Sequence, residues 1–132
     1  MSEFYLGKRS LENLEGVNPD LVKVVKRAIE ITKIDFGVTE GLRTTEKQKE
    51  YLRTGKSKTM NSKHLAQKDG YSHAVDLYCR DNNGEVTWKH EWFRLVIQSM
   101  FTAAIELGVK IKAGGLWRTF LDSPHFELDL EV

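Results

Sequence analysis

Three histidines and two aspartates fall in two short stretches of the chain and could together bind a metal ion. The first stretch carries His64, His73 and Asp76, and the second, near the C-terminus, carries Asp122 and His125. A mononuclear catalytic zinc takes about three nitrogen or oxygen ligands and keeps an open position for water. A single histidine is more often a hydrogen-bonded or surface residue than a ligand, but a catalytic metal needs side chains that converge from separate segments. The two stretches therefore predict one metal site.

Length and composition limit what else the chain can be. A chain of 132 residues can bury one ordinary hydrophobic core, so we expect a single domain over residues 1–132. The formal charge is +1, with acidic and basic residues mixed, and lacks the dense basic face that nucleic-acid binding requires. The single cysteine, Cys79, excludes an internal disulfide and a Cys-x-x-Cys motif.

No segment predicts a membrane anchor. None approaches the roughly 18 consecutive apolar residues of a spanning helix, and the N-terminus lacks the apolar run of a signal peptide. We expect the protein to be made in the host cytoplasm and to need another factor if its substrate lies outside.

The elements that must position the metal site mix helical and strand patterns. Asn18 predicts a helix start as an N-cap before Pro19, and Thr45 opens a capping-box pattern. Helices are expected over about 18–32, 45–55 and 89–107, a short amphipathic turn over 10–17, and strands over 36–39, 74–79, 85–87, 109–112 and 125–130. Because no βαβ unit repeats, the pattern favours an α+β fold, a small antiparallel sheet packed against helices on one side.

The strand expected over 74–79 exposes an acid. Asp76 alternates with Val75 and Leu77 and so points to the opposite face of the strand from them. The preceding polar stretch, 56–72, is predicted to be a long loop, which is typical of functional segments. Arg43 lies between the strand over 36–39 and the next helix, and an isolated arginine is usually a solvated surface charge.

Four separated motifs resemble the zinc peptidases that include D-alanyl-D-alanine carboxypeptidases and phage L-alanyl-D-glutamate endolysins. In that family a Ser-x-His begins the metal motif, an Asp ligand follows, and an acid-x-x-His near the C-terminus supplies a base and the third ligand. The matching segments are Glu40–Thr44, Ser62–His64, Ser72–Leu77 and Asp122–Leu128, so the resemblance covers the chain from about Gly41 onward.

The resemblance implies a role for each motif residue. It implies that His64, Asp76 and His125 bind Zn²⁺ and that Asp122 acts on the zinc-bound water. It also implies that Arg43 binds or polarises substrate and that Ser62 contacts substrate. His73 would either contact substrate as well or hydrogen-bond to a metal ligand from outside. Bound zinc lowers the pKa of water from about 15.7 to near 7.

Two departures from the family pattern matter. Eleven residues separate His64 from Asp76 rather than six, so an insertion at about Gln67 to Tyr71 must bulge out of the metal loop if His64 is the ligand. His73 is the competing first ligand, but it is three residues from Asp76 and would need a bend in the strand to share a metal with it. The second departure is Asp122 where many relatives carry Glu, which is familiar among the endolysins.

The resemblance implies a zinc-dependent L-alanyl-D-glutamate endopeptidase that cuts bacterial peptidoglycan, of the phage endolysin type and monomeric. The alternatives are a D-alanyl-D-alanine carboxypeptidase and a catalytically inactive cell-wall-binding module. Tyr71, Trp88 and Trp117 are candidates for lining a substrate groove, although core packing explains aromatic residues equally well.

Overall fold

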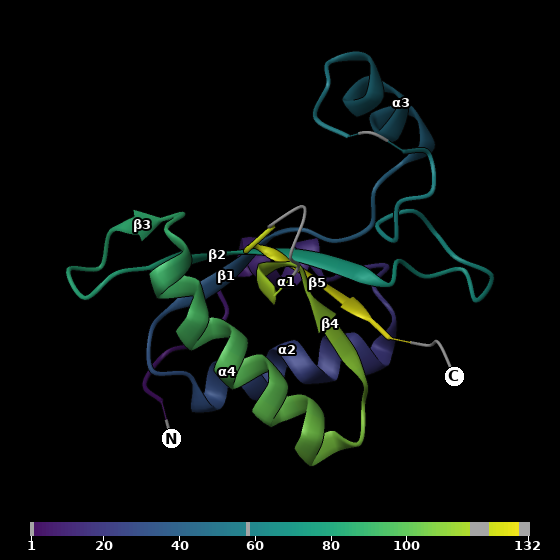
Figure 1. Cartoon of the computed structure of the whole chain (residues 1–132). Helices are drawn as coiled ribbons and strands as arrows, with labels where there is room; N and C mark the ends of the chain where they lie inside the picture. Colours follow the sequence, from purple (N-terminus) through teal and green to yellow (C-terminus); the bar gives the residue numbers. More distant parts are fainter. Residues whose placement is uncertain (1, 58, 117–121, 130–132) are drawn as a thin grey trace.

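The computed structural model describes the chain except for residues 1, 58, 117–121 and 130–132 (Figure 1). The described part contains α-helices α1 (Lys8–Asn13), α2 (Pro19–Ile31), α3 (Thr45–Arg53) and α4 (His90–Leu107), a 3-10 helix η1 (Gly114–Leu116), and strands β1 (Phe36–Glu40), β2 (Ala74–Arg80), β3 (Val86–Thr87), β4 (Ile111–Ala113) and β5 (His125–Leu128). None of these helices is long and apolar enough to span a bilayer.

One antiparallel sheet organises the fold. Its strands run in the order β1-β2-β5-β4, and β3 pairs with β2 as a hairpin. Helices α2 and α4 lie together across one face, whereas α3 stands away from the sheet at the far end of β1 (Figure 1). The expected α+β class, with one antiparallel sheet and helices on one side, is confirmed.

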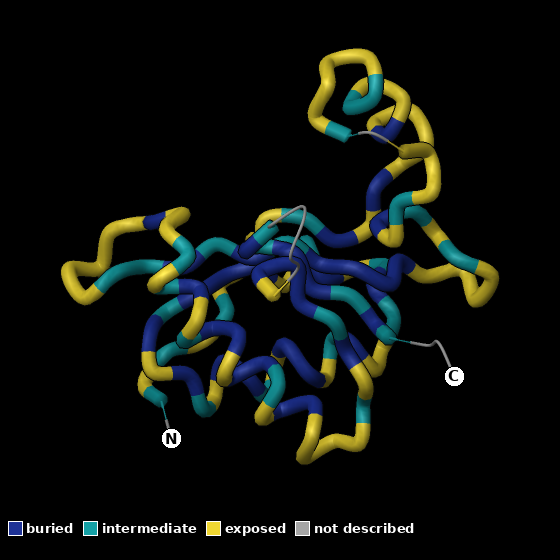
Figure 2. The backbone as a smooth tube through the Cα atoms, viewed as in Figure 1, coloured by how far each residue is buried: buried dark blue, intermediate teal, exposed yellow. Residues whose placement is uncertain are grey.

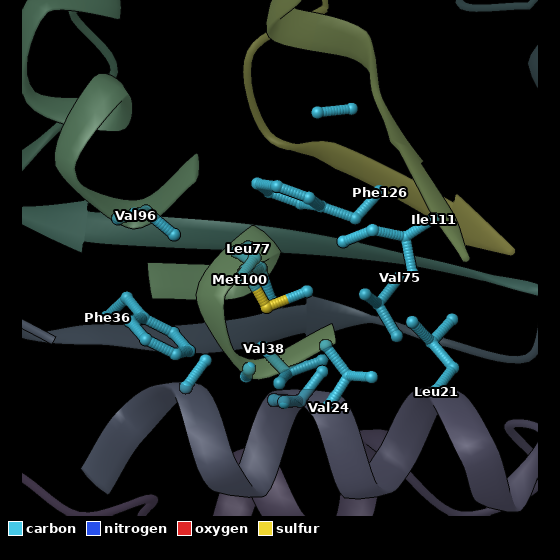
Figure 3. Close-up of a cluster of buried hydrophobic side chains, with 14 of the residues drawn as sticks. Leu21, Val24, Phe36, Val38, Val75, Leu77, Val96, Met100, Ile111 and Phe126 are labelled. Carbon is cyan, nitrogen blue, oxygen red and sulfur yellow. The ribbon is translucent and has the colours of Figure 1, made fainter. Parts of the chain in front are cut away.

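The core fills the space between the sheet and the α2–α4 layer. Figure 3 shows these side chains meeting, and Figure 2 shows buried backbone concentrated in the same layer. Strand β2 contributes Val75, Leu77 and Cys79, all fully buried, while the alternate residues of the strand face the other way. The face of the sheet opposite α2 and α4 is called the outer face below.

Helix ends follow local chemistry. The side chain of Asn18 accepts a hydrogen bond from the amide of Asp20 and caps α2, as the sequence predicts. Gly108 ends α4 in the left-handed conformation, with φ of 70°. The cap of α3 is Thr44 rather than the predicted Thr45, and it accepts from the amide of Lys47.

The bounds of several expected elements were wrong. The amphipathic turn expected over 10–17 is a helix that begins earlier, at Lys8, because the side chains of Ser10 and Asn13 bond the free edge of β1 at Val38. Strand β4 is shifted to Ile111–Ala113, where its pairing with β5 sets the register. Strand β5 extends to Leu128, and Leu130 lies outside the described residues.

Candidate metal centre

Pairing of β2 with β5 brings an acid and an imidazole side by side. Asp76 lies directly opposite His125 in the antiparallel register. Their chain neighbours Val75 and Phe126 are fully buried in the core, so Asp76 and His125 project from the outer face. Residues that are 49 positions apart in sequence are thus adjacent.

His64 approaches the same point from the loop before β2. Its Nδ1 lies 2.9 Å from the carbonyl oxygen of Gly41 and donates to it. Gly41 has no room for a side chain, because a Cβ would lie 2.1 Å from the carbonyl oxygen of Asn13. With Nδ1 committed, Nε2 of His64 is left as an acceptor, and it is buried without a hydrogen-bond partner.

These three side chains have the spacing of metal ligands. Oδ1 of Asp76 lies 3.3 Å from Nε2 of His64 and 3.2 Å from Nδ1 of His125, and the three ligand atoms all lie within 4.8 Å of one another. Zinc bonds of about 2.0–2.1 Å in a tetrahedral arrangement separate neighbouring ligand atoms by about 3.3 Å. The unpartnered Nε2 and these separations show that the residues present fit a tetrahedral metal ion with one position left over.

Electrostatic interactions within the triad shift the pKa values of Asp76 and His125. Burial opposes ionisation of Asp76, but the hydrogen bond from His125 and the nearby His64 imidazole outweigh it and hold the pKa of Asp76 well below its usual range. Burial also disfavours a charged His125, but Asp76 and Glu127 outweigh it and raise the pKa of His125 to about 9. In the metal-free protein at neutral pH, His125 is therefore a cation between two carboxylates.

Glu127 is a site residue that the sequence reasoning missed. Its Oε1 lies 2.8 Å from Nε2 of His125, on the ring edge away from Asp76. It lies two residues from His125 on β5 and so shares the outer face with it. That alternation was the available signal, because a metal-binding histidine commonly donates its second ring N–H to a carboxylate.

Asp122 lies on the rim of the triad. Its amide donates to the carbonyl of Gly114 at 3.0 Å, and a Cβ at Gly114 would lie 2.3 Å from the backbone oxygen of Asp122. The close approach therefore requires glycine. Burial and the nearby Asp76 carboxylate raise the pKa of Asp122, against the opposing effects of His125, His64 and Arg43.

Arg43 is buried, with an exposed fraction of 8%, so its reading as a solvated surface charge is wrong. Its guanidinium pairs with Glu40, donates to Oε1 of Gln48 at 2.7 Å, and lies 4.5 Å from the centre of the Tyr51 ring. Burial raises the pKa of Glu40, but Arg43 and Lys47 outweigh this effect and lower it. Arg43 thus links Glu40 at the end of β1 to Gln48 and Tyr51 of α3.

A pocket of 770 Å³ connects these groups. It opens between the outer face of the sheet and the α3 segment, and Ser62 contributes to its wall while accepting hydrogen bonds from the amide of His64 and from Arg43. Its lining is Glu40, Arg43, Tyr51, Gly55, Lys56, Ser57, Thr59, Asn61, Ser62, Lys63, His64, Asp76, Asp122, His125 and Glu127.

His73 lies apart from the triad and is not among the described residues that line this pocket. Its Nε2 lies 2.8 Å from Oδ2 of Asp69, and the same oxygen accepts from the side chain of Asn18 at 2.8 Å. The expected insertion is an ordered turn, closed by a hydrogen bond from the amide of Gln67 to the carbonyl of Tyr71. Asp69 thus ties the insertion to His73 and to Asn18 at the start of α2.

The insertion does not displace His64, because the chain on its far side returns to Lys63, next to His64. The amide of His73 donates to the carbonyl of Lys63 at 2.8 Å, which closes the segment between them into a side loop. The insertion, residues 67–71, projects as a loop away from the sheet, just before β2 (Figure 1). Of the aromatic candidates, Tyr71 belongs to this insertion, Trp88 lines a different pocket and Trp117 lies outside the described residues.

Comparisons with known proteins identify the family of the chain. The sequence profile of the phage L-alanyl-D-glutamate peptidase family matches residues 1–129. The chain is 32% identical to the L-alanyl-D-glutamate peptidase of Escherichia phage T5, over 86% of this chain and 82% of that protein. It is 28% identical to the peptidoglycan L-alanyl-D-glutamate endopeptidase CwlK of Bacillus subtilis, over 85% of this chain and 75% of that protein.

A solved structure is similar over nearly the whole chain. The crystal structure of the Serratia marcescens L-Ala D-Glu endopeptidase ChiX superposes with a TM-score of 0.85 at 38% identity, covering 96% of this chain and 92% of that one. Profile, sequence and fold agree, and the chain belongs to the phage L-alanyl-D-glutamate peptidase family.

Proposed function

We propose that this protein is a zinc-dependent endopeptidase that cuts bacterial peptidoglycan between L-Ala and D-Glu of the stem peptide, in the manner of a phage endolysin that acts on the cell wall after release. The observation that carries the proposal is the unpartnered Nε2 of His64, which is buried 3.3 Å from Oδ1 of Asp76 in a chain of this family. Each of the two histidines turns one ring nitrogen toward Asp76 and uses its other ring nitrogen for a different partner, Gly41 for His64 and Glu127 for His125.

The metal would be held by Nε2 of His64, Oδ1 of Asp76 and Nδ1 of His125. Zinc suits two imidazoles and one carboxylate, and when bound it activates water and polarises a carbonyl. Cys79, the only thiol, is buried in the core and takes no part.

Asp122 is the proton carrier. Its carboxylate takes a proton from the attacking water and delivers it to the D-Glu nitrogen as the C–N bond breaks, which leaves a carboxylate on L-Ala and a free amine on D-Glu. The raised pKa of Asp122 suits this exchange, because a carboxyl that titrates nearer neutrality both accepts and releases a proton more readily.

Arg43 and Ser62 position substrate at the pocket wall. Arg43 is fixed by Glu40 and Gln48, so its charge is held in place to stabilise the oxyanion or a substrate carboxylate. Ser62 fixes the turn that carries His64 and presents its hydroxyl beside Arg43. We assign His73 to holding the insertion rather than to contact with substrate.

Mass spectrometry of digested peptidoglycan tests the reaction. Protein stripped of metal and then restored with zinc is expected to release peptides with new amino-terminal Glu, and the stripped protein is not. Release of free D-Ala would instead indicate a carboxypeptidase, and an unchanged digest with zinc bound would indicate a binding module. Either result contradicts the proposal.

Substitutions test the metal ligands and the base. His64→Ala is expected to lose bound zinc, whereas His73→Ala retains it; the reverse would overturn the assignment. Asp122→Asn is expected to keep zinc while kcat falls by about 10²–10⁴-fold, the usual contribution of a positioned acid or base. Asp20→Asn, an exposed change on α2, serves as its matched control.

A further inference from the structure

A second pocket, of 610 Å³, lies on the outer face of the sheet beyond the metal centre. Strand β2 links the two sites, because Asp76, Tyr78 and Arg80 alternate on the same face while Val75, Leu77 and Cys79 enter the core. Two residues along a strand span about 7 Å, so Tyr78 is the next residue on this face of β2 after the proposed metal ligand Asp76.

The floor of this pocket is aromatic and fixed in place. The Tyr78 ring lies over Gly37 of β1, where a Cβ would come within 2.4 Å of a ring carbon. The Arg80 guanidinium carbon lies 5.6 Å from the centre of the Tyr78 ring. Gly37 thus removes the side chain that would otherwise lift this ring from the sheet.

The wall on the β3 side is aromatic as well, yet exposed. Trp88 is 57% exposed and Val86 is 47% exposed. The indole stacks on the buried ring of Phe93, with centroids 6.2 Å apart and planes 27° apart. Phe93 therefore holds the orientation of the indole, whose other face is exposed to solvent. A large aromatic held this way is a stacking surface with little conformational entropy left to lose.

Polar groups border these rings. Arg9 and Asn13 of α1 line the side at the β1 edge, and Arg80 lies beside the Tyr78 ring. Sugar rings have an apolar face of C–H groups and a rim of hydroxyl and amide groups, which matches aromatic surfaces bordered by hydrogen-bond donors.

The chemistry of peptidoglycan indicates which part of the substrate reaches this pocket. The L-Ala of the stem peptide is joined directly to the muramic acid of the glycan strand, so the sugar lies one residue from the bond to be cut. An extended residue spans at most about 3.6 Å. The rest of the stem carries carboxylates, and the metal-centre pocket has Lys56, Lys63 and Arg43 in its wall, beside the acids of the metal site and Glu40. The anionic stem therefore suits that pocket and the glycan suits the aromatic one.

We propose that the pocket formed by Arg9, Asn13, Tyr78, Arg80, Val86 and Trp88 binds the N-acetylhexosamine glycan strand next to the scissile bond. This inference rests on the proposed peptidase function. It makes the outer face one continuous binding surface, with the glycan at the β3 end and the stem peptide at the α3 end.

Titration with peptide-free glycan strands tests binding without turnover. Strands stripped of stem peptides by an amidase are expected to perturb the Trp88 indole resonance of the zinc-loaded protein, and Trp88→Ala to weaken their binding about tenfold. Val86→Glu, an exposed change that spares the Phe93 stack, is expected to weaken it as well. Tyr5→Ala removes an aromatic ring that is 82% exposed and serves as the control. Undetectable binding to the wild type, or equal binding to Trp88→Ala, would overturn the proposal.

Kinetics on two substrates provide a second test. The ratio of kcat/KM on glycan-linked stem peptide to kcat/KM on free stem peptide is expected to fall about tenfold in Trp88→Ala and to stay constant in Tyr5→Ala. An unchanged ratio in Trp88→Ala would contradict glycan binding at this pocket. Failure of the wild type to cut either substrate would contradict the peptidase function instead, and the titration would still decide the glycan proposal.

Discussion

Oε1 of Glu127 lies 2.8 Å from Nε2 of His125, so the imidazole that faces Asp76 with one nitrogen is held by a second carboxylate at the other. Both residues project from the outer face of β5, two positions apart. The strand itself thus supplies the group that fixes the ring and its tautomer.

Removal of this carboxylate should weaken the metal site without unfolding the protein. Glu127→Ala is expected to lower zinc affinity by about 10–100-fold, because an unanchored His125 loses orientation and basicity. Competition with a chelator of known zinc affinity measures the change. Glu85→Ala, an exposed change in the β2–β3 turn, is the control, and equal affinities in all three proteins would contradict the role given to Glu127.

Zinc affinity should rise with pH. The metal must replace the proton on Nδ1 of His125, whose pKa in the metal-free protein is raised to about 9. Affinity is therefore expected to increase about tenfold per pH unit from about pH 6.5 to 9 and to level off above that. Calorimetry in buffers of different ionisation enthalpy would show proton release on zinc binding at pH 7. A flat affinity between pH 7 and 9 would be inconsistent with this protonation state.

Gly114 should control activity through Asp122. A methyl group at Gly114 would lie 2.3 Å from the backbone oxygen of Asp122 and would push that segment away from the triad. Gly114→Ala is expected to lower kcat at least tenfold with zinc content unchanged, since small displacements of a catalytic group have large effects on rate. Gly7→Ala is its control, because a Cβ at Gly7 would meet nothing within 4 Å. Full activity of Gly114→Ala would show that Asp122 tolerates the shift.

The Asp69–His73 contact should stabilise the protein in a defined pH range. The hydrogen bonds from His73, Tyr71 and Asn18 lower the pKa of Asp69 from 3.8 to about 2. A depressed carboxylate pKa contributes stability above the unfolded-state value, and this contribution is lost as pH falls through the folded-state value. Asp69→Asn is expected to unfold at lower urea concentration than the wild type at pH 6, with the difference shrinking from about pH 4 toward pH 2. A difference independent of pH would point to geometry rather than charge.

Sequence patterns predicted the elements whose signals are local. Alternation around Asp76 placed it correctly on the outer face, and Asn18 before Pro19 marked the start of α2. Patterns favoured His64 over His73, because His73 would need a bend in the strand to share a metal with Asp76, but they could not show how the insertion is accommodated. The backbone hydrogen bond from His73 to Lys63, which turns the insertion into a side loop, exists only in the folded chain.

The burial of Arg43 was likewise beyond local patterns. An arginine is buried only where partners satisfy its charge and donors, and Glu40 and Gln48 come from the end of β1 and from α3. Their meeting depends on the angle at which α3 leaves the sheet. The same limitation applies to β4, whose bounds depend on its pairing with β5.

The hydrogen bond between His73 and Lys63 affects whether metal binding and folding are coupled. A zinc finger folds only when it binds zinc, because no other interaction holds its ligands in place. Here the folded chain itself holds the three proposed ligands. The backbone hydrogen bond from His73 to Lys63 and the contact with Gly41 place His64, and the pairing of β2 with β5 places the other two. The proposed metal centre is therefore expected to be preformed, so that a bound ion should be able to leave and return while the chain stays folded.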